Sequence, residues 1–463
     1  MRLYKTYIGY WNFHSETNSV AGSIIVGNDL LLKLIDYNKT FHEQAHIDYV
    51  TGVAQDESNN VYNFILWDLH RKSYTMTTQG MQEYEYQVSY LAFSDHSDIL
   101  SAIGNKTQIS CDISLKYTYL NWWCRSLVEE HNYKITSGNI DYHYTQPKPV
   151  LLSELESCNI LAAIYSSTQT PQSNGFSNKL VFHIIIKQHQ PIELNNCFQL
   201  IRQLEHLICL LVTIPVANEC INFKIGQANC ICVQNIKLRH YNYDQVPDDH
   251  MTTSTIKDLL NGSKVKLWFD FYNKENFALG LFFDTIYNEE LSDELRIICY
   301  SSVLEELTKR YYTRQQQPIN TKKKRKLAEI IEVLKSGGHK DKANYLKTQY
   351  LDKDDNFETR LLCLLHKYKD VWEMLNIDEF AKKVVLTRNF LVHRQIDDKL
   401  EPYLYTKKEY SKIARTLRYV ISATLLKELE FSNKDIERLL CIFGMWSLDD
   451  YVRIHPELQG QAK

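Results

Sequence analysis

The chain has 463 residues, of which 44% are hydrophobic and 24% are charged, and its formal net charge is −3. This length predicts two or three domains, and the apolar content excludes wholesale disorder. The longest apolar run, residues 206–217, is shorter than the roughly 18 residues that a membrane-spanning helix needs. Because the first residues also lack the pattern of a secretory signal, we expect a cytoplasmic protein.

Residues 1–150 follow a mostly alternating pattern of apolar and polar side chains, which is typical of β-strands. Expected strands lie at 61–70, 71–78, 84–93 and 108–120. We therefore predict a β-rich N-terminal domain over residues 1–150, built of β-sandwich-like sheets.

Residues 151–285 mix the two kinds of pattern. Strands are expected at 179–188 and 265–272, and an amphipathic helix at 196–212. We interpret this stretch as a mixed β/α continuation of the N-terminal region, and the sequence leaves open whether it is a separate domain.

From residue 286 to residue 463 the apolar residues recur at spacings of three and four, which predicts helices. The expected helices are 291–315, 324–338, 356–375, 377–396, 405–430 and 432–443. The fold class is thus α+β and multidomain, with an all-α bundle at the C-terminus.

Charge divides along the same line. Residues 285–463 carry 32 Lys and Arg against 28 Asp and Glu, whereas residues 1–284 carry 21 against 28. The helical part is therefore better suited to an anionic partner. Its one basic run has two interpretations, a solvated helix entry or a contact with RNA. The possible RNA-binding residues are Lys322, Lys323, Lys324, Arg325 and, further along, Arg394.

Eleven cysteines are scattered along the chain without any pair at the spacing of a zinc ligand motif. We expect them to be reduced and mostly buried.

The segment 41–46 contains the His-Glu-x-x-His pattern of zinc hydrolases, formed by His42, Glu43 and His46. That site needs a long helix, but the residues that follow predict a strand, a turn and a second strand. The preferred interpretation is therefore surface histidines at the edge of a β-sheet, and a zinc hydrolase stays as a minor alternative.

A second motif, Arg388-Asn389-x-x-x-His393, lies in the helix expected at 377–396. Helical geometry places Arg388 in the middle of an apolar arc, where a charge is costly unless it meets an anion or a carboxylate. The simplest partner is an internal carboxylate such as Glu305 or Glu306. A similar pair, Arg360 and His366, has another spacing and no asparagine, and we assign it no role.

A C-terminal helical bundle that carries Arg-Asn-x-x-x-His resembles the HEPN superfamily, and the whole layout resembles the ApeA-type HEPN proteins of bacterial antiphage defence. The resemblance implies a homodimer in which two copies of the motif form one site that cuts RNA without a metal or other cofactor. It assigns catalysis to Arg388, Asn389 and His393, with possible support from Glu305 and Glu306.

In the chemistry that this resemblance implies, one His393 takes the proton of a ribose 2′-OH and the other gives a proton to the departing 5′ oxygen. Arg388 would bind the phosphate, and Asn389 would orient the ring of His393. The substrate would be single-stranded RNA, for example a tRNA loop, and the N-terminal region would bind a phage-derived trigger. Since some relatives keep the fold for association only, a non-catalytic dimerisation module is the main alternative.

Overall fold

The computed structural model divides the chain into two compact units. The first comprises Met1–Lys274 and Ile286–Glu290, and the second comprises Glu275–Thr285 and Leu291–Lys463. The structure describes residues 5–13, 19–27, 29–36, 45–76, 81–97, 99, 108–109, 112–124, 148–169, 177–225, 228–234, 256–260, 263–311, 321–346, 356–372, 375–394 and 398–442. Within these ranges, none of the helices has both the length and the apolar content that crossing a membrane requires.

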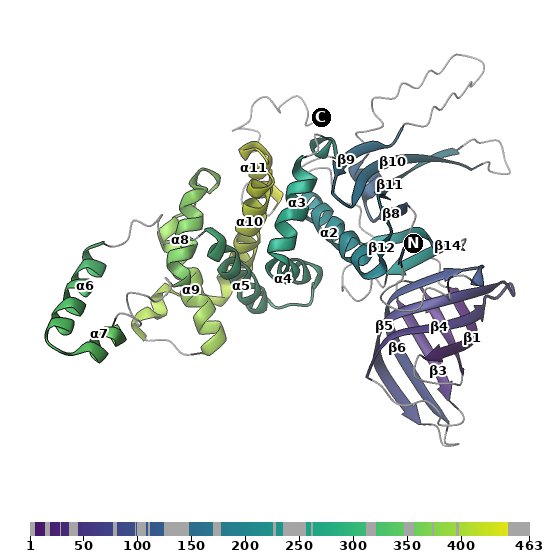
Figure 1. The fold of residues 1–463 in the computed structure, drawn as a ribbon, viewed down its shortest axis with the longest axis horizontal. Helices are drawn as coiled ribbons and strands as arrows, with labels where there is room; N and C mark the ends of the chain where they lie inside the picture. The colour runs from purple at the N-terminus through teal and green to yellow at the C-terminus, as the bar shows by residue number, and fades with distance from the viewer. Residues whose placement is uncertain are drawn as a thin grey trace, which may run out of the picture. The chain divides into compact units, whose positions relative to one another are not determined.

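The first unit begins with six antiparallel strands that close into a barrel (Figure 1). Closure occurs because β3 pairs with β2 on one side and with β6 on the other. The expectation of sandwich-like sheets therefore differs from the structure for these strands. They are β1 (Lys5–Phe13), β2 (Val20–Val26), β3 (Leu30–Asp36), β4 (His46–Gln55), β5 (Val61–Met76) and β6 (Gln82–Ser94).

Alternate side chains of these strands fill the barrel with an apolar core, as the period-two pattern predicts. Trp11, Leu32, Phe64 and Tyr86 are fully buried there. Gly52 of β4 lies directly against the indole ring of Trp11, and a Cβ at this position would come within 2.3 Å of the ring. Close packing across the barrel thus requires a glycine at residue 52.

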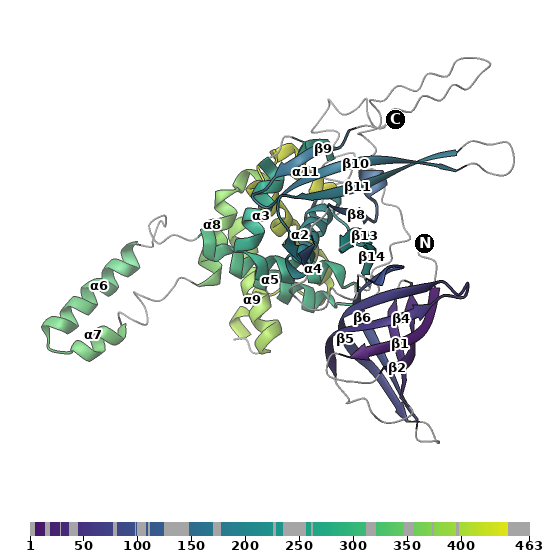
Figure 2. The same ribbon diagram turned by 45° about the vertical axis from the view of Figure 1, so that its right-hand side comes forward.

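The barrel continues into a second sheet through β6, whose residues 90–93 pair with β14. From β14 the order is β13, β8, β11, β10 and β9 (Figure 2). Strands from residues 1–150 and from residues 151–285 therefore share one sheet. The bounds of the remaining strands are β7 (Gln108–Ile109), β8 (Ile113–Tyr117), β9 (Val150–Glu154), β10 (Cys158–Gln169), β11 (Ser177–Gln188), β12 (Ile192–Glu193), β13 (Asn218–Ile225) and β14 (Ala228–Gln234).

Three helices accompany this sheet, α1 (Leu120–Trp123), α2 (Leu194–Val212) and α3 (Ser263–Lys274). Helix α2 confirms the amphipathic helix expected at 196–212. The strand expected at 265–272 is wrong, because this segment forms α3. Its buried residues include Val265, Trp268, Phe269 and Tyr272, which follow helical spacing, and its many aromatic residues had favoured a strand.

The second unit is helical, and its central helix α5 contacts α8, α9 and α10. Helix α6 ends before Gly337 and Gly338, and Gly338 has a φ of 81°, which a residue with a side chain rarely adopts. The bounds are α4 (Asn276–Tyr287), whose last residues belong to the first unit, α5 (Asp293–Tyr311), α6 (Thr321–Ser336), α7 (Lys340–Leu346), α8 (Phe357–Lys367), α9 (Ile377–His393), α10 (Tyr410–Glu428) and α11 (Asn433–Ile442).

The structure confirms the expected fold class, a β-rich N-terminal region followed by a helical C-terminal region. The helices α4 and α7 were not expected from the sequence. The segment expected as one helix at 356–375 ends its α-helical part at Lys367 and continues as a short 3-10 turn.

Candidate active site

Helix α9 carries the Arg-Asn-x-x-x-His motif in its last two turns. The helix begins after Asn376, whose side chain accepts a hydrogen bond from the backbone N–H of Glu379. It ends at His393, because Arg394 adopts the left-handed conformation with a φ of 55°. The motif is therefore held at the end of a regular helix.

Arg388 lies at the border of the buried stripe of α9. The stripe consists of Phe380, Ala381, Val384, Thr387 and Leu391. Arg388 keeps 25% of its side chain exposed, and Val392, which ideal helical geometry places in the apolar arc around Arg388, is 45% exposed. The buried stripe is thus displaced by about a tenth of a turn from the arc predicted from the sequence, and Arg388 lies on one side of it and not in its middle.

The guanidinium of Arg388 meets a carboxylate of the same chain. Its Nη2 lies 3.0 Å from Oε2 of Glu305 on α5, so one of the two partners expected from the sequence is present. Its Nη1 donates to Oδ1 of Asn389 at 3.1 Å. Its Nε is buried and has no hydrogen-bond partner among the described residues. The ion pair offsets the cost of partial burial, and the buried Nε–H has no acceptor among the described residues.

Asn389 therefore contacts Arg388, and no described bond joins it to His393. The side chain of His393 is exposed at the helix end, and among the described residues nothing is hydrogen-bonded to it. One chain supplies a single imidazole, which lies on the surface and is accessible to a ligand or to another chain.

Two family models match the chain. ApeA N-terminal domain 1 matches residues 6–260, and Apea-like HEPN matches residues 299–435, which include the whole motif of α9. The chain belongs to the ApeA family. Comparison with curated proteins and with solved structures gives no match. The family supports the expected class of HEPN-type antiphage defence protein.

Arg360 is the residue of this ApeA-family site to which the sequence analysis gave no role. It projects from α8, and its Nη2 lies 3.4 Å from Oε1 of Glu305, so Glu305 joins Arg360 to Arg388. The exposed fractions of these side chains are only 12% for Arg360 and 31% for Glu305. The spacing between Arg360 and His366 did not reveal this role, because the partner of Arg360 is Glu305, which is distant in the sequence.

The other predicted site residues are more dispersed. Glu306 pairs with Lys309 on the surface of α5 and not with Arg388. Arg394 is exposed, and its guanidinium lies over the ring of Phe390. Hydrogen bonds from the backbone and from Ser292 lower the pKa of Glu294, and the positive charges of Lys407 and Arg394 add to this effect. The side chains of Lys322, Lys323, Lys324 and Arg325 lie outside the described residues.

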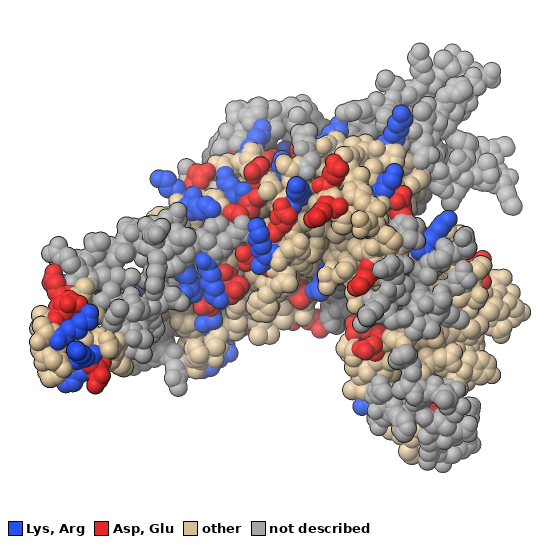
Figure 3. All heavy atoms as spheres, in the orientation of Figure 1, with Lys and Arg blue, Asp and Glu red and all other residues tan. Residues whose placement is uncertain are grey.

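The face of the ApeA-family chain drawn in Figure 3 mixes basic and acidic side chains over the helical elements. Blue and red groups are interspersed there, and the described residues form no large area of one charge on this face.

The segment with the zinc hydrolase pattern does not have the geometry of that enzyme class. His46 is the first residue of strand β4, whereas the pattern needs His46 on a helix one turn after the first histidine. His42 and Glu43 lie outside the described residues. His46 instead meets Asp68 and His70 of strand β5. The preferred interpretation, surface histidines at the edge of a β-sheet, is confirmed for the exposure of His46 but not for the edge, because β4 pairs with both β1 and β5.

Asp68 is an ionised carboxylate in this cluster. Partial burial opposes its ionisation, but hydrogen bonds from Ser89 and His46 and the nearby imidazoles outweigh that effect and hold its pKa below the ordinary value. His46, Asp68 and His70 were not recognised as a group in the sequence, because Asp68 and His70 belong to no motif with His46.

Proposed function

We propose that this ApeA-family chain is an endoribonuclease that cuts RNA without a metal at a site shared by two copies of the chain. The observation that carries the proposal is the position of Arg388, Asn389 and His393 on one helix of the matched HEPN region, with His393 exposed. The side chains supply an anion-binding group and a group that can move a proton near neutral pH.

The proposed reaction is attack of a ribose 2′-OH on the adjacent phosphorus. One imidazole takes the 2′ proton, the bond from phosphorus to the 5′ oxygen breaks, and a second imidazolium gives its proton to that oxygen. The products are a 2′,3′-cyclic phosphate and a 5′-OH end. Because each chain has one His393, two copies of α9 supply both roles, which explains the need for a homodimer.

Arg388 is suited to hold the phosphate. Two guanidinium groups, those of Arg388 and Arg360, share the single carboxylate of Glu305, so the group keeps one net positive charge. The side chain of Arg388 is 25% exposed, and its guanidinium has more N–H donors than Glu305 and Asn389 use, so donors remain for an incoming phosphate oxygen. Asn389 would then hold the guanidinium in place through the bond to Nη1.

The substrate class that fits this chemistry is single-stranded RNA, with a tRNA loop as one example, because in-line attack needs a ribose free of duplex geometry. We further propose that the β-rich region responds to a phage-derived trigger, and that cleavage of cellular RNA in the cytoplasm then arrests growth.

The test produces wild-type and His393→Ala chains together in equal amounts, so that dimers assemble at random from the mixed chains. If every site needs His393 from both chains, an equal mixture retains about a quarter of the wild-type cleavage rate, since only that share of dimers is wild type on both sides. A rate of about half would overturn the shared site, because each chain would then act alone. The matched control is His366→Ala, which removes another exposed helical histidine. Cleavage must persist in EDTA.

A second function, a non-catalytic dimerisation module, is favoured by the internal ion pair between Arg388 and Glu305. In that case Arg388 only stabilises the fold. Arg388→Ala would then lower the midpoint of thermal unfolding as much as Glu305→Gln does, and folded His393→Ala would behave like the wild type in growth and in RNA gels. Loss of cleavage in folded His393→Ala would exclude this function.

A further inference from the structure

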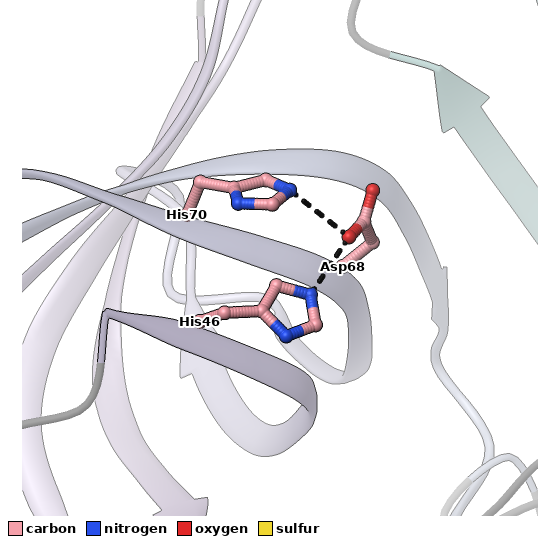
Figure 4. Close-up of side chains that lie close together, drawn as sticks. All are labelled: His46, Asp68 and His70. Atoms are coloured by element: carbon pink, nitrogen blue, oxygen red, sulfur yellow. Dashed lines mark hydrogen bonds and ion pairs between the residues drawn. The ribbon is translucent and has the colours of Figure 1, made fainter.

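Two histidines and one aspartate meet on the outer surface of the N-terminal barrel (Figure 4). The Nε2 atoms of His46 and His70 lie 2.9 Å and 3.1 Å from the same atom, Oδ1 of Asp68. The two imidazole rings have centroids 4.7 Å apart. One ligand atom from each of the three residues lies within 4.8 Å of the others.

The strand register brings the three side chains together. His46 of β4 and His70 of β5 are directly opposite each other in the antiparallel pair. Asp68 has a left-handed backbone with a φ of 54°, which is unusual within a strand, and its carboxylate turns toward both rings. Its other oxygen, Oδ2, accepts a hydrogen bond of 2.6 Å from Ser89 of β6.

We propose that His46, Asp68 and His70 form a binding site for a zinc-like divalent cation. Two imidazole nitrogens and one carboxylate oxygen are the donor set of many open zinc sites, in which water is the fourth ligand. With zinc–ligand bonds of about 2.0–2.2 Å, tetrahedral ligand atoms stand about 3.3 Å apart, so the two N···O distances need to widen by only a few tenths of an ångström.

The environment favours a cation over a purely hydrogen-bonded cluster. Both ring nitrogens converge on one carboxylate oxygen, so a cation bound at this point would accept electron pairs from all three atoms at once. Ser89 holds the carboxylate from behind, and the carboxylate of Asp48 lies 3.7 Å from Nδ1 of His46, on the side of the ring away from Asp68. Such outer contacts orient metal ligands and increase their basicity.

The exposed fractions, 46% for His46, 49% for Asp68 and 58% for His70, leave one side of the site open to water. A cation there would link β4 to β5 where the two strands pair. The site is therefore expected to stabilise this edge of the barrel and to offer one exchangeable coordination position.

Cobalt(II) as a spectroscopic probe tests this site in the full-length protein without a histidine tag, after treatment with EDTA and removal of the chelator. The wild type should bind cobalt saturably, with visible absorption bands of a four- or five-coordinate ion, and zinc should displace it. Zinc should also raise the midpoint of thermal unfolding, and EDTA should reverse that shift.

The variants are His46→Gln, Asp68→Asn and His70→Gln, with His366→Gln as the matched control. His366 has the same exposed fraction as His70, 58%, and lies near the carboxylate of Asp378, but among the described residues it belongs to no group of metal-ligating side chains. The three site variants should lose the cobalt bands and the zinc-dependent shift, and the control should keep both. Ser89→Ala should weaken zinc binding about tenfold, because it removes the support of Asp68.

Circular dichroism of each variant checks that loss of binding is not loss of folding. If a site variant is unfolded, the zinc affinity of Ser89→Ala tests the proposal instead, since that change leaves all three ligands in place. The proposal is overturned if the wild type shows no saturable cobalt bands, if the folded site variants bind like the wild type, or if the bands show thiolate ligation. It is also overturned if Ser89→Ala leaves the affinity unchanged.

Discussion

The barrel and the helical unit each contain a carboxylate shared by two basic side chains. In the barrel, Asp68 meets His46 and His70, and in the helical unit, Glu305 meets Arg360 and Arg388. The first group is about half exposed, whereas the side chains of the second are 12% to 31% exposed.

The difference that matters is whether the basic groups can give up their protons. An imidazole is neutral in part of the physiological range and then offers an electron pair to a metal. A guanidinium stays charged and has only donors, so it binds anions. The same arrangement thus suits a cation in the barrel and a phosphate in the helical unit.

The largest expected effect is the loss of RNA cleavage when His393 of the helical unit is replaced. His393→Ala should lower RNA cleavage by about 10²–10⁴-fold, the usual contribution of a general acid or base. It should leave the unfolding midpoint unchanged, because the side chain is exposed. Labelled RNA in EDTA measures the rate, and the products should carry 5′-OH ends that a kinase can phosphorylate directly.

The corresponding control is the cobalt spectrum of His393→Ala, which should equal that of the wild type, since His393 lies on α9 and the proposed metal ligands lie on β4 and β5. A cleavage rate within a few-fold of the wild type would contradict the catalytic role of His393.

A smaller effect concerns stability within the helical unit. Glu305→Gln removes the carboxylate that Arg360 and Arg388 share and should lower the free energy of unfolding by about 1–3 kcal/mol. Its neighbour Glu306 forms a surface pair with Lys309, so Glu306→Gln should cost less than about 1 kcal/mol. Urea unfolding measures both variants.

Sulfate sharpens this comparison. Added sulfate should restore part of the stability of Glu305→Gln, because it can replace the missing anion between Arg360 and Arg388. If Glu305→Gln and Glu306→Gln lower the free energy of unfolding equally and neither responds to sulfate, the shared carboxylate stabilises the fold no more than a surface ion pair does.

The smallest effect contrasts the exposed histidines of the barrel with a buried one. Nδ1 of His206 on α2 and the hydroxyl of Tyr272 form a hydrogen bond of 2.9 Å. Burial, and to a smaller extent the charge of Arg202, holds the pKa of His206 well below 6.5. Protonation therefore favours the unfolded chain. The stability that neutral His206 contributes is present above pH 6.5 and is lost as the pH falls toward the lower, folded-state pKa.

The unfolding free energy of the wild type should thus fall below pH 6.5 by up to about 1.4 kcal/mol per pH unit more than that of His206→Asn. Urea titrations at several pH values between neutrality and mild acid compare the two chains. Parallel pH profiles would contradict a neutral buried imidazole.

Periodicity in the sequence identified most of the secondary structure and the order of the two regions. The three-and-four spacing of apolar residues predicted α2, α5, α9 and α10 correctly, because the buried residues of these helices recur at helical spacing. It failed at residues 265–272, where aromatic residues typical of strands occupy helical positions, and it did not reveal α4 or α7.

By itself, the sequence determined the fold class, the helix that carries Arg388 and His393, and the family, because local periodicity and a short motif depend on neighbouring residues. Only the tertiary structure decided which carboxylate pairs with Arg388, that Arg360 joins it, and that Asp68 lies between His46 and His70. These contacts depend on strand register and helix packing between residues up to 83 positions apart, which no local pattern encodes.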